Sequence, residues 1–312
     1  MKSNLFFGEG CILILFAQFC MSCSADVIIE DLEIEIIDSI KYVNKKEVIT
    51  DFKELSYDNI RVEDAFTMDL HANNSFQGLA IYEDYLFQTY HSKSCIDIYD
   101  LTNNKLVYSL QLNPEGKVHC NNADFGSFRY DQSDIFPLLY LENRSGVRTT
   151  SVYRIVPNDS TFNLIGVQSI EFSPCSWTIT NNDCENSWMY ITHFGEKNSS
   201  DTRTISKINI PEISANKIKI SLDSTEIIES FNIQTNKVHQ DATIYKNKLF
   251  QLRGGPGSGD IYVYDLIEKR IIFIIDWKEL GMQGEPEGIG WYKDHLVISN
   301  NSGQVYNMYF VK

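Results

Sequence analysis

Three segments of the chain repeat one pattern of apolar and polar positions. Residues 77–82 read QGLAIY, residues 240–245 read QDATIY and residues 287–292 read EGIGWY, so the three align residue for residue. Each is followed by two polar residues and then by a second apolar run, which is the pattern of a β-hairpin with a two-residue turn. A hairpin that recurs at intervals of roughly forty residues or more is typical of the blades of a β-propeller.

The segments that follow two of these hairpins are also alike. In blade 1 and in blade 4 a third strand alternates apolar and polar residues, an Asp-Leu turn follows, and an apolar fourth strand comes next. The corresponding residues are 95–99, 100–105 and 106–112 in blade 1, and 260–264, 265–269 and 271–277 in blade 4. An aspartate suits the turn because its side chain accepts bonds from backbone amides ahead of it. Each of the two blades is therefore predicted to have four strands.

The middle of the chain carries the pattern more weakly. Blade 2 is expected to begin near His119 and to have its later strands at residues 136–141, 151–156 and 162–172. Blade 3 is expected to have strands at residues 176–180, 188–193, 204–210 and 225–233. The count is then five blades, with four blades plus insertions, or six blades, as the alternatives.

Blade 5 has three predicted strands of its own, at residues 287–292, 295–300 and 304–310. A propeller closes its ring by joining its first and last blades, which also protects the sheet edges. Residues 62–70 lie before blade 1 and have the pattern of a strand without a partner. We predict that they form the fourth strand of blade 5. The fold class is therefore an all-β propeller over residues 61–312, most simply with five four-stranded blades.

The first 22 residues differ in composition from the rest. Lys2 precedes an apolar run at residues 11–19, which is typical of a secretory signal and shorter than the roughly 20 residues that span a membrane. The segment resembles a bacterial lipoprotein signal, in which a small residue precedes the lipidated cysteine, as Ser22 precedes Cys23. We expect cleavage after residue 22, lipidation at Cys23 and an acidic tether over residues 23–60. Secretion without a lipid is the alternative.

The resemblance places the protein in a bacterial cell envelope, anchored to the outer or the cytoplasmic membrane on its extracytoplasmic face. A net charge of −15 argues against nucleic acid as a partner, because phosphate binding needs clustered basic residues. Export permits disulfides, and Cys175 and Cys184 flank a polar loop across which they could pair. Free thiols are the equal alternative, and the spacing is not that of a zinc site.

Polar residues gather where the predicted inner strands begin, and these strand ends meet at one mouth of the central channel. The candidate ligand-binding residues are Gln77, His119, Asn121, Asn122, Asp124, His239, Asp241, Glu285 and Glu287. Carboxylate and amide oxygens suit Ca²⁺, for which Asn121, Asp241 and Glu287 are the candidate ligands, and they also suit a hydroxyl-rich molecule. The alternative is that these groups satisfy one another inside a narrow channel.

Two further motifs are interpreted as structural. Residues 253–259, RGGPGSG, lack the Gly-Lys-Ser/Thr of a phosphate loop and precede a strand. They are expected to form a flexible loop in blade 4, from which Arg253 could reach an anionic ligand. His119 and His239 occupy similar positions, and the sequence has no Gly-x-Ser-x-Gly nucleophile motif, so a structural role is expected for both.

The start of blade 1, Phe-Gln-Gly-Leu at residues 76–79, resembles the glutamine cyclotransferase family of five-bladed propellers. The Pro-Glu-Gly at residues 286–288 resembles lactonase-type exported propellers. In the cyclotransferase family the second strand of blade 1 supplies a catalytic glutamate, whereas this chain has Gln88 there. An amide does not act as a general acid or base, so the resemblance implies the fold and not the cyclase activity.

Three functions are compatible with these residues. The first is a binding or scaffold module that presents its channel mouth to a small molecule, a glycan or a cell-envelope protein. The second is a hydrolase of the lactonase type, in which Ca²⁺ held by Glu287, Asp241, Asn121 and Asn122 polarises a carbonyl and activates water. The third is a glycan-cleaving enzyme, which needs two opposed carboxylates about 5–10 Å apart, drawn from Asp124, Asp241 and Glu287.

Overall fold

The computed structural model divides into two compact units, Met1–Glu47 and Val48–Lys312. The residues that it describes are 32–37, 40–45, 49, 52–69, 75–91, 95–112, 119–143, 149–159, 161–173, 178–194, 202–214, 216, 218–235, 237–255 and 258–312. In the first unit, β1 (Leu32–Ile37) pairs antiparallel with β2 (Ile40–Lys45). The predicted signal peptide and Cys23 lie outside the described residues. Within the described part of the chain there is no helix capable of crossing a bilayer.

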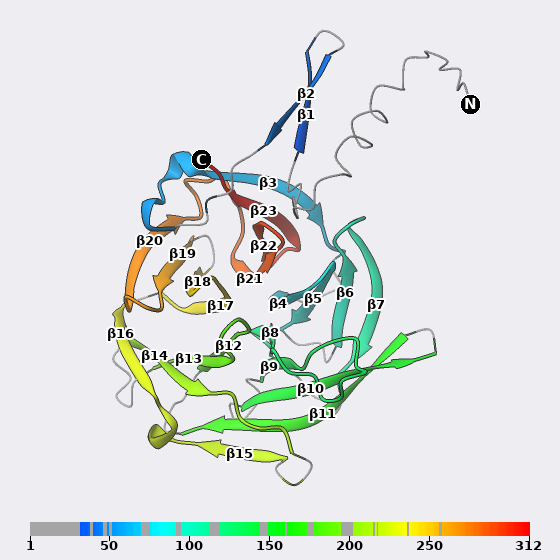
Figure 1. The fold of residues 1–312 in the computed structure, drawn as a ribbon, viewed down its shortest axis with the longest axis vertical. Helices are drawn as coiled ribbons and strands as arrows, with labels where there is room; N and C mark the ends of the chain where they lie inside the picture. The colour runs from blue at the N-terminus through cyan, green and yellow to red at the C-terminus, as the bar shows by residue number, and fades with distance from the viewer. Residues whose placement is uncertain are drawn as a thin grey trace, which may run out of the picture. The chain divides into compact units, whose positions relative to one another are not determined.

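The second unit is a five-bladed β-propeller, with β4, β8, β12, β17 and β21 innermost (Figure 1). Blade 1 contains β4 (Phe76–Tyr82), β5 (Tyr85–Tyr90), β6 (Cys95–Asp100) and β7 (Lys105–Gln111). Blade 2 contains β8 (Ala123–Phe125), β9 (Leu139–Asn143), β10 (Thr149–Asn158) and β11 (Thr161–Phe172). Blade 3 contains β12 (Thr178–Asp183), β13 (Trp188–Phe194), β14 (Thr202–Asn209) and β16 (Glu229–Gln234). Blade 4 contains β17 (His239–Tyr245), β18 (Lys248–Gly255), β19 (Ser258–Asp265) and β20 (Arg270–Asp276).

Blade 5 confirms the predicted closure of the ring. It contains β21 (Pro286–Tyr292), β22 (His295–Asn300) and β23 (Gln304–Phe310), and its fourth strand is β3 (Ile60–Thr67). β3 pairs antiparallel with β23, from Ile60 opposite Phe310 to Thr67 opposite Gln304. The inner strands contact one another in the order β4, β8, β12, β17, β21 and back to β4. The three repeated segments therefore stand in neighbouring positions around one centre, as predicted.

Blades 2 and 3 differ from the prediction in detail. A fifth strand, β15 (Lys219–Leu222), pairs parallel with β11 on the outer edge of blade 2. The last strand of blade 3 begins later than the predicted residue 225, because Asp223 caps a 3-10 turn, η3 (Ser224–Glu226), through a capping box. The last strand of the blade, β16, therefore begins only at Glu229.

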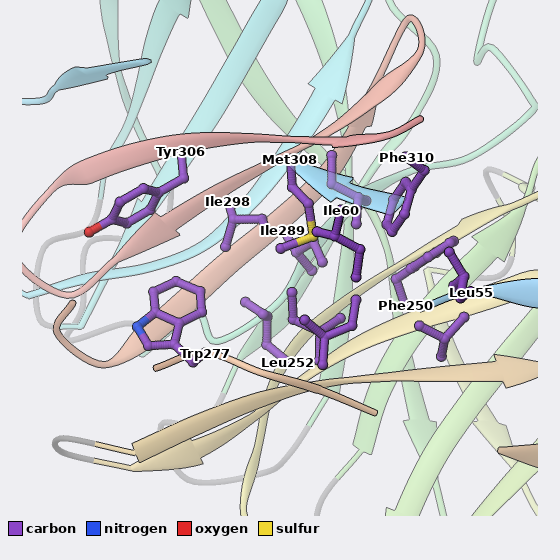
Figure 2. Close-up of a cluster of buried hydrophobic side chains, with 14 of the residues drawn as sticks. Leu55, Ile60, Phe250, Leu252, Trp277, Ile289, Ile298, Tyr306, Met308 and Phe310 are labelled. Carbon is purple, nitrogen blue, oxygen red and sulfur yellow. The ribbon is translucent and has the colours of Figure 1, made fainter. Parts of the chain in front are cut away.

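The segment just before β3 belongs to the propeller core. Ile49, Phe52 and Leu55 are buried in the largest hydrophobic cluster, together with side chains of blades 4 and 5 (Figure 2). Two 3-10 turns, η1 (Phe52–Glu54) and η2 (Tyr57–Asn59), carry this segment to β3. The compact unit that contains the propeller begins at Val48, and apolar side chains of this segment pack with those of blades 4 and 5.

The inner strands of blades 5, 1 and 2 approach one another too closely for side chains to fit between them. A Cβ atom added at Gly78 would lie 2.6 Å from the carbonyl oxygen of Asn121 on the next blade. One added at Gly288 would lie 2.9 Å from the carbonyl oxygen of Gln77. Both distances are below van der Waals contact, so only glycine fits here. Neighbouring inner strands of these three blades are therefore packed backbone to backbone at this level.

Candidate functional site

Asp241, near the start of β17, joins four blades at the centre of the ring. Its Oδ2 accepts hydrogen bonds from the backbone N–H groups of Leu79 and Ile289, both at 3.0 Å. Its Oδ1 accepts from Asn122 Nδ2 at 2.6 Å and from the N–H of Ala242 at 2.9 Å. Complete burial raises the pKa of Asp241 well above its usual value, although these donors oppose the shift. A cation at Asp241 would have to displace some of these donors.

A second polar chain links blades 2, 4 and 5. Asn121 Nδ2 donates to Gln240 Oε1 at 3.1 Å, and Gln240 Nε2 donates to Glu285 Oε1 at 3.0 Å. Burial raises the pKa of Glu285, and the bond from Gln240 opposes the shift. Gln77 instead bonds its own strand, since its Nε2 donates to the carbonyl of Phe76 at 2.9 Å. The structure thus joins several predicted site residues by hydrogen bonds, while Asn121 Oδ1 has no partner among the described residues.

Three further predicted residues, His119, His239 and Glu287, also lie near the starts of the inner strands. His239 and Glu287 are buried, and the ring of His119 packs against that of His91, with the centroids 4.1 Å apart. Within the described residues, no group of three or more His, Cys, Asp or Glu side chains could hold a metal ion.

We call the face where the inner strands begin the top face, and the face where they end the bottom face. Several segments between the strands lie outside the described residues. Ligand binding at the top face, and the calcium site of Asn121, Asp241 and Glu287, remain predictions.

Gln88 has a structural role in the wall of the channel. Its Nε2 donates to the carbonyl oxygens of Gln77 at 2.7 Å, Gly78 at 3.2 Å and Thr89 at 2.9 Å. Its Oε1 accepts from Ser299 Oγ of blade 5 at 3.2 Å. The amide therefore ties β4, β5 and β22 together, and this arrangement requires a donor at position 88.

Replacing Gln88 with glutamate should destabilise the propeller by about 3 kcal/mol at neutral pH. The buried carboxylate would face three carbonyl oxygens and would have no N–H group to donate to them. Urea unfolding at constant protein concentration measures the loss. Gln111→Glu makes the same change on the exposed side of β7 and should cost less than about 0.5 kcal/mol. Equal stabilities of the two variants would contradict the role assigned to Gln88.

Arg253 is not on a flexible loop, contrary to the prediction. β18 continues to Gly255 and β19 begins at Ser258, so the glycines mostly extend the strand pair. Arg253 is fully buried, its Nη2 donates to Gln251 Oε1 at 2.5 Å, and its Nε donates to the Tyr264 hydroxyl at 3.1 Å. These bonds hold the guanidinium inside blade 4, which assigns it a structural role.

A cavity of about 450 Å³ opens on the bottom face, where the inner strands of all five blades end. Its lining includes apolar side chains from Leu79, Ile81, Ile244 and Ile289, aromatic side chains from Tyr82, Tyr245 and Trp291, and charged side chains from Asp124, Arg129, Asp183, Glu185 and Lys246. Of the site residues predicted from the sequence, only Asp124 lines this cavity. This cavity is thus at the opposite end of the inner strands from the predicted mouth.

The aromatic side of the cavity is held in place by packing. The rings of Tyr245 and Trp291 stack with centroids 3.8 Å apart and an angle of 8° between their planes. Phe52 packs edge-on against both rings. Across the cavity lining, the hydroxyl of Tyr82 accepts a hydrogen bond from Arg129 Nη2 at 2.6 Å. The cavity is therefore largely preformed, as ligand sites usually are.

Two polar side chains of the cavity have unused capacity for hydrogen bonds. Asp124, at the centre of β8, accepts from the N–H of Asn182 at 2.6 Å. Burial raises the pKa of Asp124 to about 7, and the bonds from Asn182 and from the N–H of Phe125 oppose the shift. Asn182 is 3% exposed, its side-chain amide also interacts with Asp124, and its Oδ1 has no hydrogen-bond partner among the described residues.

Sequence reasoning missed Asn182 because the pattern of blade 3 is weak. Strand pairing places it opposite Met189, the position that Ile81 and Ile244 occupy in blades 1 and 4. The sequence signal that could have identified Asn182 is a polar residue at a position that is apolar in the equivalent strands.

Cys184 also lines the cavity and carries a free thiol. Its Sγ donates to the carbonyl of Phe125 at 3.3 Å, and burial raises its pKa to about 12. Since the thiolate is the nucleophilic form, the raised pKa lowers the fraction of reactive thiolate at neutral pH, although the residue as a whole is exposed. Cys175, the other half of the considered disulfide, lies outside the described residues.

Comparison with known proteins supports the fold alone. No protein-family profile matches the chain, and no curated protein matches it. Among solved structures, the PQQ-bound aldose sugar dehydrogenase from Streptomyces coelicolor has a TM-score of 0.50 at 9% identity, covering 81% of this chain and 98% of its own. The glutaminyl cyclase from Myxococcus xanthus has a TM-score of 0.50 at 10% identity, with the same coverages. The resemblance in fold to cyclotransferase-type propellers is thereby confirmed.

Proposed function

We propose that this propeller is a binding module whose ligand site is the cavity on the bottom face. The observation that carries the proposal is the buried amide of Asn182 beside the carboxyl of Asp124 in a preformed cavity, where the amide Oδ1 has no partner among the described residues. Buried polar groups without partners are costly and rare in folded proteins. A ligand that supplies the missing hydrogen bonds would remove this cost.

The dimensions and composition of the cavity support the same proposal. Its volume of about 450 Å³ falls within the roughly 300–1,000 Å³ typical of small-molecule sites. Such sites combine apolar and aromatic walls with a few polar groups that orient the ligand. Here Tyr245 and Trp291 supply a rigid aromatic wall, and Asp124 and Asn182 supply the orienting groups.

Binding is better supported than hydrolysis. Asp241 has both oxygens engaged by four donors, and Gln88 stands where the cyclotransferase family has its glutamate. In the cavity, Asp183 accepts from the N–H and the Nδ2 of Asn186 and so caps a turn. The similar solved structures are named as enzymes, but at these identities they share only the fold, and fold alone does not assign activity.

The lipid anchor at Cys23 and the extracytoplasmic location, both proposed from the sequence, complete the proposal. A binding module held on the cell-envelope surface would meet small molecules or glycans arriving from outside. The acidic charge of −15 would favour positively charged ligands over anionic ones through long-range attraction.

A screen of polar small molecules and glycan fragments against the full chain should find compounds that raise the melting temperature. Saturation at 100 times the dissociation constant stabilises the folded state by about 2.7 kcal/mol. Ser127→Trp fills the cavity lining and should abolish the shift, whereas Ser133→Trp makes the same change at an exposed site of the same loop and should preserve it. Compounds whose shifts survive Ser127→Trp would bind elsewhere, and if all of them did so the proposed site would be wrong.

A further inference from the structure

We infer that the ligand of the bottom-face cavity carries a protonated amine, which Asp124 pairs with and Asn182 orients. This inference rests on the proposed function and names the chemical class of its ligand. It follows from two properties of the cavity: a carboxylate without a counter-ion among the described residues, and beside it an amide oxygen, Asn182 Oδ1, that has no partner among them.

Asp124 lacks a counter-ion in the described structure. No cation of the described residues pairs with it, although two cations line the same cavity. Arg129 is directed to other acceptors, since its Nε donates to the carbonyl of Asp134 at 3.0 Å and its Nη2 donates to Tyr82. The ammonium of Lys246 lies 5.0 Å from the centroid of the Tyr245 ring. A largely buried carboxylate is costly unless a charge of opposite sign accompanies it, so a cationic ligand group is favoured at Asp124.

Asn182 would make the site select an ammonium group over other cations of similar size. An ammonium group has three N–H donors and no acceptor. The carboxylate of Asp124 and the Oδ1 of Asn182, which has no hydrogen-bond partner, offer acceptors on adjacent side chains, because the Asn182 N–H itself bonds Asp124. Two fixed acceptors on adjacent side chains suit the directional N–H donors of an amine.

The charge of the cavity extends the same preference. The acidic side chains of Asp183 and Glu185 also line it and would repel an anionic ligand. The rings of Tyr82, Tyr245 and Trp291 add apolar surface, but Arg129 and Lys246 already lie over Tyr82 and Tyr245, and Trp291 stacks on Tyr245. The cavity therefore combines charge pairing and directional acceptors, and both favour an organic ammonium over a neutral or an acidic molecule.

The proton on Asp124 should control the affinity. Around it, the hydroxyl of Tyr140 and the thiol of Cys184 both have pKa values raised by burial, so neither ionises near neutral pH. Arg129, Lys246 and the acidic pair of Asp183 and Glu185 are the other charged groups of the cavity.

The direction of the pH effect follows from the pKa of Asp124, which burial raises to about 7. Above that pH the carboxylate is ionised and the affinity for an ammonium is full. Between about pH 8 and about pH 6 the ionised fraction, and with it the affinity, should fall about tenfold.

The test uses three probes of matched shape on the full chain: 2-phenylethylamine, which is cationic, 2-phenylethanol, which is neutral, and phenylacetate, which is anionic. At about pH 8, titration calorimetry should show the amine binding at least about tenfold tighter than the alcohol, with phenylacetate weakest. Asp124→Asn keeps an acceptor for the Asn182 N–H and should remove the preference for the amine. Asp159→Asn makes the same change at an exposed turn outside the cavity and should leave the preference within about twofold.

Equal affinities for the amine and the alcohol, sensitive to Ser127→Trp, would overturn the inference and leave the proposed site intact. A preference for the amine that survives Asp124→Asn, or that does not weaken from about pH 8 to about pH 6, would also overturn it. The pH measurement needs no variant and so holds even if Asp124→Asn fails to fold. If neither the probes nor any screened compound responded to Ser127→Trp, both the site and its ligand class would be wrong.

Discussion

Replacing Asp241 with alanine is expected to destabilise the propeller by about 4 kcal/mol, one of the two largest losses expected for any single substitution considered. The change leaves three buried backbone N–H groups, of Leu79, Ile289 and Ala242, and the side-chain amide of Asn122 without their acceptor. Each orphaned donor costs about 1–3 kcal/mol. Removing a buried carboxylate recovers part of this cost, and the four donors outweigh the recovery.

The loss at Asp241 should appear as a lower midpoint in urea unfolding, monitored by tryptophan fluorescence. Asp100→Ala is the matched control, since Asp100 is an aspartate on an exposed turn that accepts from the N–H of Thr102 at 2.8 Å. It should cost no more than about 1 kcal/mol. If the two variants unfolded at the same urea concentration, Asp241 would not be the joint between blades that its hydrogen bonds indicate.

Replacing Phe52 with alanine should cost about 3–5 kcal/mol, the usual loss for a buried phenylalanine. Phe52 is 1% exposed and meets four aromatic rings edge-on, those of Tyr245, Phe250, Trp291 and Phe310. Truncation leaves a cavity among rings that belong to blades 4 and 5, and it removes the support behind the aromatic wall of the bottom-face cavity.

Two measurements distinguish this role from that of a passive tether. Urea unfolding should show the loss of stability, and near-UV circular dichroism should show a weaker tryptophan signal as Trp291 loses its fixed surroundings. Phe128→Ala is the control, because Phe128 is 48% exposed and its truncation should cost less than about 1 kcal/mol. If Phe52→Ala left the stability unchanged, residues 48–60 would belong to the tether and not to the propeller core.

The predictions that proved correct depended on short-range pattern. Alternation of apolar and polar residues has a period of two in a strand, and a two-residue turn sets the register of the hairpin that follows. Both signals are complete within about fifteen residues. Blades 1, 4 and 5, which carry them clearly, were placed almost to the residue, and the unpartnered strand before blade 1 correctly indicated how the ring closes.

The candidate site was much less predictable. The sequence indicated which residues lie at the start of the inner strands, and these do meet, but mainly as partners of one another. Whether a cavity opens at the top or the bottom of the channel depends on how far neighbouring inner strands stand apart. That separation is set by contacts such as Gly78 against the backbone of Asn121, which no local pattern reveals.

The chain by itself determined the strands, their turns, the order of the blades and the acidic charge, because these depend on neighbouring residues. Tertiary structure alone decided that Asp241 bonds Leu79, 162 residues away, that Gln88 ties three strands, and that Phe52 belongs to the core. It also placed Asn182 beside Asp124 at the bottom of the ring. Contacts between residues so far apart arise only after the ring closes, and the cavity that we propose as the ligand site is made entirely of such contacts.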